Sequence, residues 1–149
     1  MNTYFKALKT ILEGKDAITF FSGAGLSVSS GLPDFRGDKD GFWKSNTPVH
    51  FSDFICPECL KGLVKVGTIS FGQSLDTKIL KIAHAVSAAA KYFISVGSSL
   101  KVSPANSFIK VAKENGAKII ILNKDATPFD DYADIVINDY LENIYEQIK

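Results

Sequence analysis

The sequence is poor in cysteine, in net charge and in long apolar runs, and each shortage excludes a class of protein. Only two cysteines occur among 149 residues, which excludes a disulfide framework and fits a reducing compartment. Lys and Arg number 17 against 16 Asp and Glu, so the net charge of +1 predicts no bulk attraction to nucleic acid or membrane. Apolar runs of about five residues fall far short of the roughly twenty that cross a bilayer. We therefore expect a soluble protein that is cytoplasmic or otherwise intracellular.

What remains is an ordinary globular composition in which strands alternate with helices. Apolar residues make up 46% of the chain, enough for the core of one domain over residues 1–149. The spacing predicts strands at Ala17–Phe21, Tyr92–Val96, Lys118–Leu122 and Ile135–Ile137. Helices are expected before, between and after them, so we predict an α/β fold with a doubly wound, mostly parallel, Rossmann-like sheet and helices on both faces.

Four of these helices have recognisable signals. Residues 4–12 carry apolar side chains at helical spacing before Gly14, and Leu141 to Ile148 do the same at the other end. In the helix predicted over Asp76–Ala90, the inward face is expected to hold Ile79, Ala83, Val86 and Ala90. Another helix is predicted to begin with Ser103 as cap and Pro104 in its first turn, and to end at Asn115–Gly116.

Residues 38–75 differ from the rest because they show no sustained period. They are rich in Gly, Pro, Ser and aromatic residues. We interpret them as a reduced small lobe inserted into the sheet domain, since a structureless loop of this length is unusual in a compact domain.

A glycine turn follows the first predicted strand within FSGAGLSVSSGLPDFRG, residues 21–37. Gly23, Ala24 and Gly25 would open a short helix, where the missing Cβ atoms let backbone N–H groups approach a pyrophosphate. The alternative is a tight turn between strand and helix that holds no ligand, because glycine pairs alone are weak signals.

Small polar residues follow each of the other strands. Ser98 and Ser99 come after Gly97, Asn123 ends the strand IIIL, and Asp139 and Tyr140 follow the last strand. In a doubly wound sheet the ligand lies beyond the carboxyl ends of the strands, where strand order reverses. An Asn at the ribose position, where dehydrogenases use Asp or Glu, argues against hydride transfer. Each residue alone could be a turn or cap residue, but their recurrence favours one shared ligand.

Four motifs in order resemble the sirtuins, the NAD-dependent protein deacylases. They are the glycine turn with its PDFR segment, VGSSLKVSPA at Val96–Ala105, IIILNKDAT at Ile119–Thr127 and ADIVIND at Ala133–Asp139. Two parts of the family pattern are missing: a Gln-Asn-x-Asp segment and half of a four-cysteine zinc module. The chain therefore resembles a minimal, internally shortened sirtuin.

The resemblance implies NAD or ADP-ribose as ligand and assigns roles to named residues. Phe35 would shield the reactive sugar carbon, Arg36 would order the cofactor loop, and Asp34 would lie by the nicotinamide pocket. His50 is the candidate general base, since His84 lies within a predicted helix. The implied cofactor-binding set is Gly23, Ala24, Gly25, Ser27, Asp34, Phe35, Arg36, Gly97, Ser98, Ser99, Asn123, Asp139 and Tyr140.

The resemblance also implies a metal and a peptide partner. Cys56 and Cys59 form half of a zinc site, which His50, Glu58, water or a second chain in a homodimer would have to complete; the alternative is a pair of free or redox-labile thiols. Ile69–Leu75 resembles the segment that pairs with an acyl-lysine peptide, and the alternative is a strand packed on its own lobe.

Three functions stay open at this point. The first is an NAD-dependent protein-lysine deacetylase or deacylase whose shortened lobe impairs catalysis. The second is a non-catalytic sensor of NAD or ADP-ribose. The third is an NAD hydrolase, which needs only water in place of a peptide.

Overall fold

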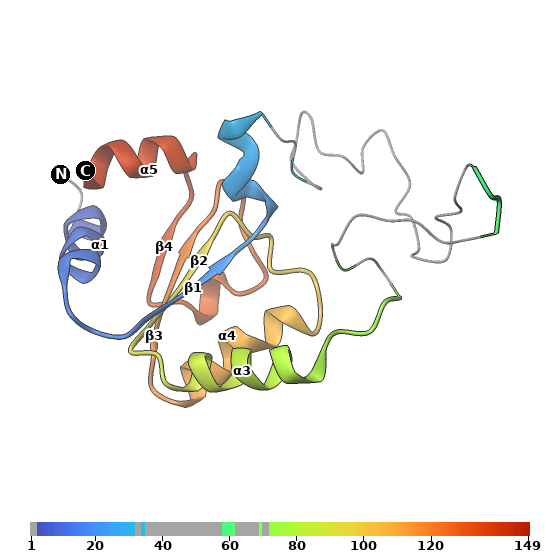
Figure 1. Ribbon diagram of the computed structural model, residues 1–149. Helices are drawn as coiled ribbons and strands as arrows, with labels where there is room; N and C mark the ends of the chain where they lie inside the picture. Colours follow the sequence, from blue (N-terminus) through green and yellow to red (C-terminus); the bar gives the residue numbers. More distant parts are fainter. Residues whose placement is uncertain (1–2, 32–33, 35–57, 62–68, 70–71) are drawn as a thin grey trace.

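A four-stranded parallel sheet forms the centre of the computed structural model, which describes residues 3–31, 34, 58–61, 69 and 72–149 (Figure 1). Its order is β1-β2-β3-β4. The strands are β1 (Ile18–Ser22), β2 (Tyr92–Val96), β3 (Lys118–Leu122) and β4 (Ile135–Ile137). The helices are α1 (Thr3–Glu13), α3 (Thr77–Ala88), α4 (Phe108–Glu114) and α5 (Leu141–Ile148), with 3-10 segments η1 (Ala24–Ser30), η3 (Ala105–Ser107) and η4 (Asp130–Tyr132).

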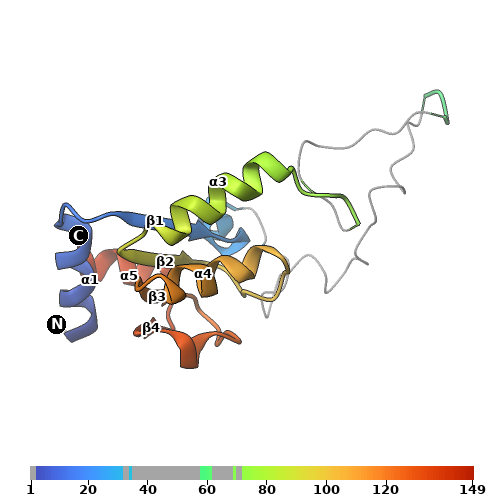
Figure 2. The same cartoon turned by 90° about the horizontal axis from the view of Figure 1, so that it is seen from below.

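Helices cover both faces of this sheet, so the predicted fold class is confirmed. Alternate residues of β2 point to opposite faces: Phe93 belongs to a core under α4, and Ile94 to a second core with Leu8 of α1 and Ile144 of α5. Figures 1 and 2 show α3 and α4 together on one side and α1 and α5 together on the other. Within the described residues the strand order does not reverse, and the second face is covered by the first and last helices.

The predicted strands are found because their sequences are continuously apolar. Tyr92–Val96, Lys118–Leu122 and Ile135–Ile137 have the bounds that the sequence predicts, and β1 is shifted by one residue. Ile119 to Ile121 of β3 are fully buried. A run of Ile suits a parallel strand because both of its faces are covered.

Asp134, directly before β4, forms hydrogen bonds with β3 and with α4. Its Oδ2 accepts hydrogen bonds from the Ile119 amide and from Lys113 Nζ, both at 2.8 Å, and its own amide donates to the Ile119 carbonyl at 2.8 Å. Burial alone would raise the pKa of this carboxyl group, but the hydrogen bonds from Lys113 and Ile119 outweigh it and lower the pKa below its usual value.

The start of α3 is as predicted, but its inward face is not. Asp76 caps the helix, its Oδ1 accepting from the amides of Lys78 at 2.7 Å and Ile79 at 3.3 Å. Ile79 and Val86, expected to face inward, are 65% and 48% exposed. Ala90 is buried as expected, and Ser87 is buried in place of Val86, because the helix lies at the margin of the sheet and only one flank of its apolar stripe is covered.

The predicted start of the next helix is also wrong. Ser103 makes no cap, Ala105–Ser107 form a 3-10 turn, and α4 begins at Phe108. The inward residues Ile109 and Ala112 and the end at Asn115 are as expected.

In the described part of the chain no helix is both long and apolar enough to span a bilayer.

Candidate functional site

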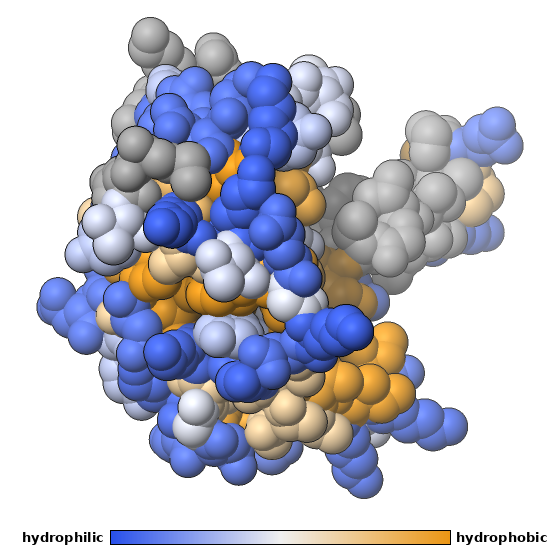
Figure 3. Space-filling model, turned by 90° about the vertical axis from the view of Figure 1, so that its left-hand side faces the viewer, coloured by the Kyte–Doolittle hydropathy of each residue, from blue (hydrophilic) through white to orange (hydrophobic). Residues whose placement is uncertain are grey.

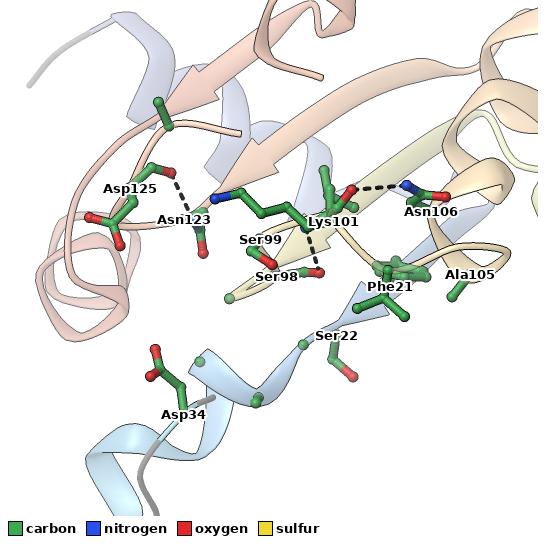
Figure 4. A pocket seen from close by; sticks show the side chains of 17 residues that line it. Phe21, Ser22, Asp34, Ser98, Ser99, Lys101, Ala105, Asn106, Asn123 and Asp125 are labelled. Carbon is green, nitrogen blue, oxygen red and sulfur yellow. Dashed lines mark hydrogen bonds between the residues drawn. The ribbon is translucent and has the colours of Figure 1, made fainter. Parts of the chain in front are cut away.

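A cavity of about 280 Å³ lies at the carboxyl ends of β1, β2 and β3 (Figure 4). Its walls come from the ends of these strands and the loops that follow them, namely residues 21–25, 97–102, 123, 125 and 126, together with Asp34, Ala105 and Asn106. This is where the sequence places the ligand site. A cavity of this size is at the lower end of the range for small-molecule sites.

Hydrogen bonds join the three loops in one repeated pattern. The residue directly after each strand donates its amide to the last residue of the next strand: Gly23 to Val96 at 2.9 Å, Gly97 to Leu122 at 2.8 Å, and Asn123 to Ile137 at 3.2 Å. The parallel ladder therefore continues into the floor of the cavity, and the sheet register determines where each loop lies.

The glycines of the first loop are needed for packing against the second loop. A Cβ on Gly23 would lie 2.5 Å from the Gly97 carbonyl oxygen, and a Cβ on Gly25 would lie 2.7 Å from the same atom. Gly97 has φ +60 and a Cβ there would lie 2.5 Å from the Leu26 amide nitrogen. The amides of Gly23 and Gly25 donate to Val96 and Gly97, so they are not free to bind a pyrophosphate, contrary to the sequence-based expectation.

The second loop is held in shape by its own polar groups. Ser98 Oγ accepts from the Leu100 amide at 3.2 Å, and Asn106 Nδ2 donates to the Leu100 carbonyl at 3.1 Å. Leu100 is buried with a positive φ of 53. This conformation presents Ser98, Ser99 and Lys101 to the cavity (Figure 4).

The third loop carries an amide and a carboxylate. Asn123 Nδ2 donates to the Asp125 carbonyl at 2.7 Å, and Asn138 Nδ2 donates to the Asn123 carbonyl at 3.1 Å. These bonds fix the Asn123 side chain, whose amide oxygen is an acceptor beside the cavity. Lys101 extends toward this end of β3 in Figure 4. Among the described lining residues, Lys101 is the cation and Asp34 and Asp125 are the anions.

Eight residues of the predicted cofactor-binding set line this cavity. They are Gly23, Ala24, Gly25, Asp34, Gly97, Ser98, Ser99 and Asn123. Their contact with a nucleotide stays a prediction.

Three others of that set are not among the lining residues. Ser27 lies within η1, where its carbonyl accepts the amide of Gly31. Asp139 Oδ1 accepts from the Tyr140 amide and from Asn143 Nδ2, both at 2.7 Å, at the start of α5. Tyr140 is 52% exposed, with Lys124 Nζ 5.0 Å from its ring centre.

The catalytic and metal predictions fall mostly outside the described residues. Phe35, Arg36, His50 and Cys56 lie there, and Cys59 is an exposed turn residue. Within the described ranges no three His, Cys, Asp or Glu side chains gather as a metal site. Of the predicted peptide segment, residues 69 and 72–75 are described and none of them belongs to a strand.

Sequence reasoning missed Lys101, Asn106 and Asp125. Lys101 and Asp125 stand within the quoted motifs VGSSLKVSPA and IIILNKDAT, two residues after Ser99 and Asn123. That spacing is the signal that could have found them, because a loop returning over a strand end brings alternate residues to one side. No local signal places Asn106, since its position depends on the Leu100 carbonyl.

Comparison with known proteins identifies relatives of the same kind throughout. The Sir2 family model matches residues 23–54. An NAD-dependent protein deacetylase of Shouchella clausii is 50% identical over 84 residues, which cover 56% of this chain and 35% of that protein. The chain thus matches about a third of the length of this relative.

A second relative aligns over nearly its whole length. It is an NAD-dependent protein deacetylase of Oceanobacillus iheyensis, 27% identical over 221 residues, covering 89% of this chain and 94% of the relative. Because the alignment of 221 positions exceeds the 149 residues of this chain, at least 72 of those positions have no residue here.

Solved structures show the same fold. A Sir2 homologue in complex with ADP ribose aligns with a TM-score of 0.80 at 21% identity, over 99% of this chain and 95% of the other. Sir2Tm bound to a propionylated peptide aligns with a TM-score of 0.70 at 20% identity, over 97% of each chain. The resemblance drawn from the four sequence motifs is confirmed.

Proposed function

Because this chain belongs to the sirtuin family, we propose that its cavity binds NAD or ADP-ribose. The observation that carries the proposal is the convergence of three strand-end loops on one cavity, lined by Ala24, Ser98, Ser99 and Asn123. Small side chains and hydroxyl groups suit the close approach of phosphate and ribose oxygens. One relative of this fold is described in complex with ADP ribose.

The size and charges of the cavity favour the adenosine diphosphate half of the ligand. About 280 Å³ is enough for part of a dinucleotide only. Asn123 and Asp125 would accept the ribose hydroxyls, and Lys101 would neutralise phosphate charge. Since the amides of Gly23 and Gly25 are already bonded, the phosphates would depend on Lys101 and the serine loop rather than on the glycine turn.

The reaction that we propose is NAD-dependent removal of an acyl group from lysine. The bond between nicotinamide and the ribose breaks, and the acyl group passes from lysine to ADP-ribose, with water completing the release of free lysine. Asp34, Phe35 and Arg36 would shape the nicotinamide side, and His50 would be the general base for the ribose hydroxyl. A peptide at Ile69–Leu75 would supply the acyl-lysine, and a Sir2 structure with a propionylated peptide supports this substrate class.

A binding module without catalysis is the second candidate. At least 72 aligned positions of the Oceanobacillus relative have no residue here, and the chain has no Gln-Asn-x-Asp segment. Loss of the nicotinamide side would leave ADP-ribose binding intact. Cys56 and Cys59 would bind zinc only if His50, Glu58 or a second chain completed four ligands.

Calorimetry with ADP-ribose and NAD tests the binding proposal. We expect Asn123→Ala to weaken ADP-ribose binding at least tenfold. Asn115→Ala is the matched control, because its Nδ2 also donates to a backbone carbonyl, that of Val111 at 2.9 Å, but lies away from the cavity. Wild-type protein that binds neither nucleotide at millimolar concentration would refute the proposal.

Nicotinamide release, measured with and without an acetyl-lysine peptide, separates the three functions. Release that needs the peptide and is abolished by His50→Ala identifies a deacylase. Release without peptide identifies an NAD hydrolase. Binding with no release identifies a sensor. We expect the first outcome.

A further inference from the structure

Along one edge of the sheet, backbone groups have no strand partner among the described residues. Within the described residues β1 pairs with β2 alone. The Ala17 carbonyl accepts from the amides of Lys91 and Tyr92, and the Gly23 amide donates to Val96. Since backbone groups alternate along a strand, those of Thr19 and Phe21 face β2 as well. The N–H and C=O groups of Ile18, Phe20 and Ser22 therefore point away from the sheet.

Large apolar side chains flank this edge on both faces. Phe20 lies on the face of α1 and α5 and is 58% exposed. On the opposite face, α3 exposes Ile79 at 65%, Ile82 at 63% and Val86 at 48%. Thr19 Oγ1 donates to the Val86 carbonyl at 3.0 Å, which fixes this end of α3 beside β1.

The exposed stripe of α3 faces away from α4. The two helices pack together through the other flank of α3, on which Ser87 is buried. Figure 2 shows α3 beyond β1 on the outer side of the sheet, and Figure 3 shows hydrophobic surface gathered at the lower right, where α3 lies. Exposed apolar side chains, and backbone groups without a partner in the described part of the chain, thus occur along one margin of the molecule.

We propose that this margin is the interface of a twofold-symmetric homodimer, in which β1 pairs antiparallel with β1 of a second copy. An axis beside Phe20 places Phe20 opposite its counterpart and Ile18 opposite Ser22. Each of these pairs has its N–H and C=O groups directed at the other, which gives about six hydrogen bonds between the chains. The two sheets become one continuous eight-stranded sheet.

The same axis brings the remaining apolar groups together. The two Phe20 rings meet on one face of the joined sheet as a cross-strand aromatic pair. The two α3 stripes of Ile79, Ile82 and Val86 meet on the other face. A second copy of this chain supplies a partner for all of these groups at once. It offers the same strand edge for the backbone hydrogen bonds and the same apolar side chains for both faces, because the interface is self-complementary.

The area agrees with a dimer of ordinary size. At their observed exposures, the four side chains present roughly 300 to 400 Å² of apolar surface. A standard interface buries about 800 Å² per partner, of which a little over half is apolar. The margin therefore supplies most of the apolar part of such an interface before the rim is counted.

Disulfide trapping tests the pairing and its register. In a background with Cys56→Ser and Cys59→Ser, Phe20→Cys would place two Cα atoms about 5.5 Å apart, which suits a disulfide. We expect mild oxidation to convert most of this variant to a covalent dimer that reductant reverses. Tyr145→Cys is the matched control, since Tyr145 is 62% exposed on α5, away from the margin, and we expect at least tenfold less crosslinking there.

Mass measurement in solution tests the apolar face. We expect wild-type protein to have twice the mass of one chain at micromolar concentration, Ile82→Lys to have the mass of one chain, and Tyr145→Lys to stay dimeric. Unchanged far-ultraviolet circular dichroism of Ile82→Lys would show that it still folds. Wild-type protein that is monomeric at 100 µM, or dimers with equal crosslinking at both cysteines, would overturn the proposal.

A monomer whose margin is covered by another segment of this chain, or a complex with a different protein only, is likewise an outcome against a homodimer. The dimer does not depend on nucleotide binding. Failure of ADP-ribose binding would leave the mass and crosslinking results unaffected, so the two proposals fail separately.

Discussion

The inner strands and the edge strand of the sheet have similar sequences but different surroundings. Phe93 of β2 is 1% exposed and Phe20 of β1 is 58% exposed, although both lie in short apolar strands. β2 has a neighbour on each side, whereas β1 has one in the described part of the chain. Burial in this protein depends on the neighbours of a strand more than on its composition.

The largest expected effect compares these two regions directly. Ile120→Ala, at a fully buried position of β3, should lower the free energy of unfolding by about 2–5 kcal/mol because it leaves a cavity. Phe20→Ala should cost under about 1 kcal/mol in the monomer, since little of the ring is covered. Urea unfolding at several protein concentrations checks both values. A large cost for Phe20→Ala that grows with concentration would show that a partner covers the edge.

Two glycine substitutions, at Gly97 and at Gly116, test how tightly the loops after β1 and β2 pack together. Gly97→Ala should lower the free energy of unfolding by about 2 kcal/mol and abolish ADP-ribose binding, because the new Cβ meets the Leu26 amide at 2.5 Å. Gly116→Ala is the control: its φ of +88 carries the same kind of backbone strain, but nothing lies within 4 Å of the added Cβ. Equal losses for the two variants would mean that backbone strain alone matters and that the loops do not interlock.

A smaller effect is expected on the far side of the sheet, at β4. Asp134→Asn should cost about 1 kcal/mol at pH 7, a value reduced for the solvent exposure of the pair with Lys113. The folded-state pKa of Asp134 is lowered, so its contribution is present above the ordinary value of 3.8 and is lost as pH falls below it. Unfolding measured from pH 7 to pH 2.5 should show the two proteins converging at acid pH. A constant difference across that range would contradict the assignment.

The smallest effect is expected at a buried polar residue of the inner strand β2. Ser95 on β2 is fully buried, and its Oγ has no hydrogen-bond partner among the described residues. Removing an unpaired hydroxyl should leave stability unchanged or raise it by about 0.5 kcal/mol, so Ser95→Ala should melt at the same temperature or slightly higher. A loss above about 1 kcal/mol would mean that Oγ is bonded in solution.

The strands could be predicted from sequence because their signal is local. The run KIIIL is apolar on both faces after its first residue, so a strand can be predicted without deciding which face is buried. Its predicted bounds are those observed for β3. The inward face of α3 could not be predicted, because helical spacing shows a stripe but not which of its flanks a neighbour covers. Ile79 and Val86 are in the stripe and exposed all the same.

The sequence could predict those site residues that directly follow a predicted strand. Ser98, Ser99 and Asn123 follow strands directly and meet at one cavity. Asp139 and Tyr140 follow β4, whose end is not part of the cavity wall, so their contact with a nucleotide stays a prediction. The sequence predicted the glycine turn as a binding site for a pyrophosphate. In the structure, Gly23 and Gly25 instead allow the first loop to pack closely against the second loop, and their amides already donate to backbone carbonyls.

Leu100 has a consequence for how the cavity moves. Its backbone is held in a left-handed conformation from both sides, by Ser98 Oγ at its amide and by Asn106 Nδ2 at its carbonyl, while its side chain is 2% exposed. Opening this loop would break all three restraints together. Deuterium uptake at the Leu100 amide should therefore be nearly as slow as in β2, which would make the binding wall a rigid template rather than a flexible flap.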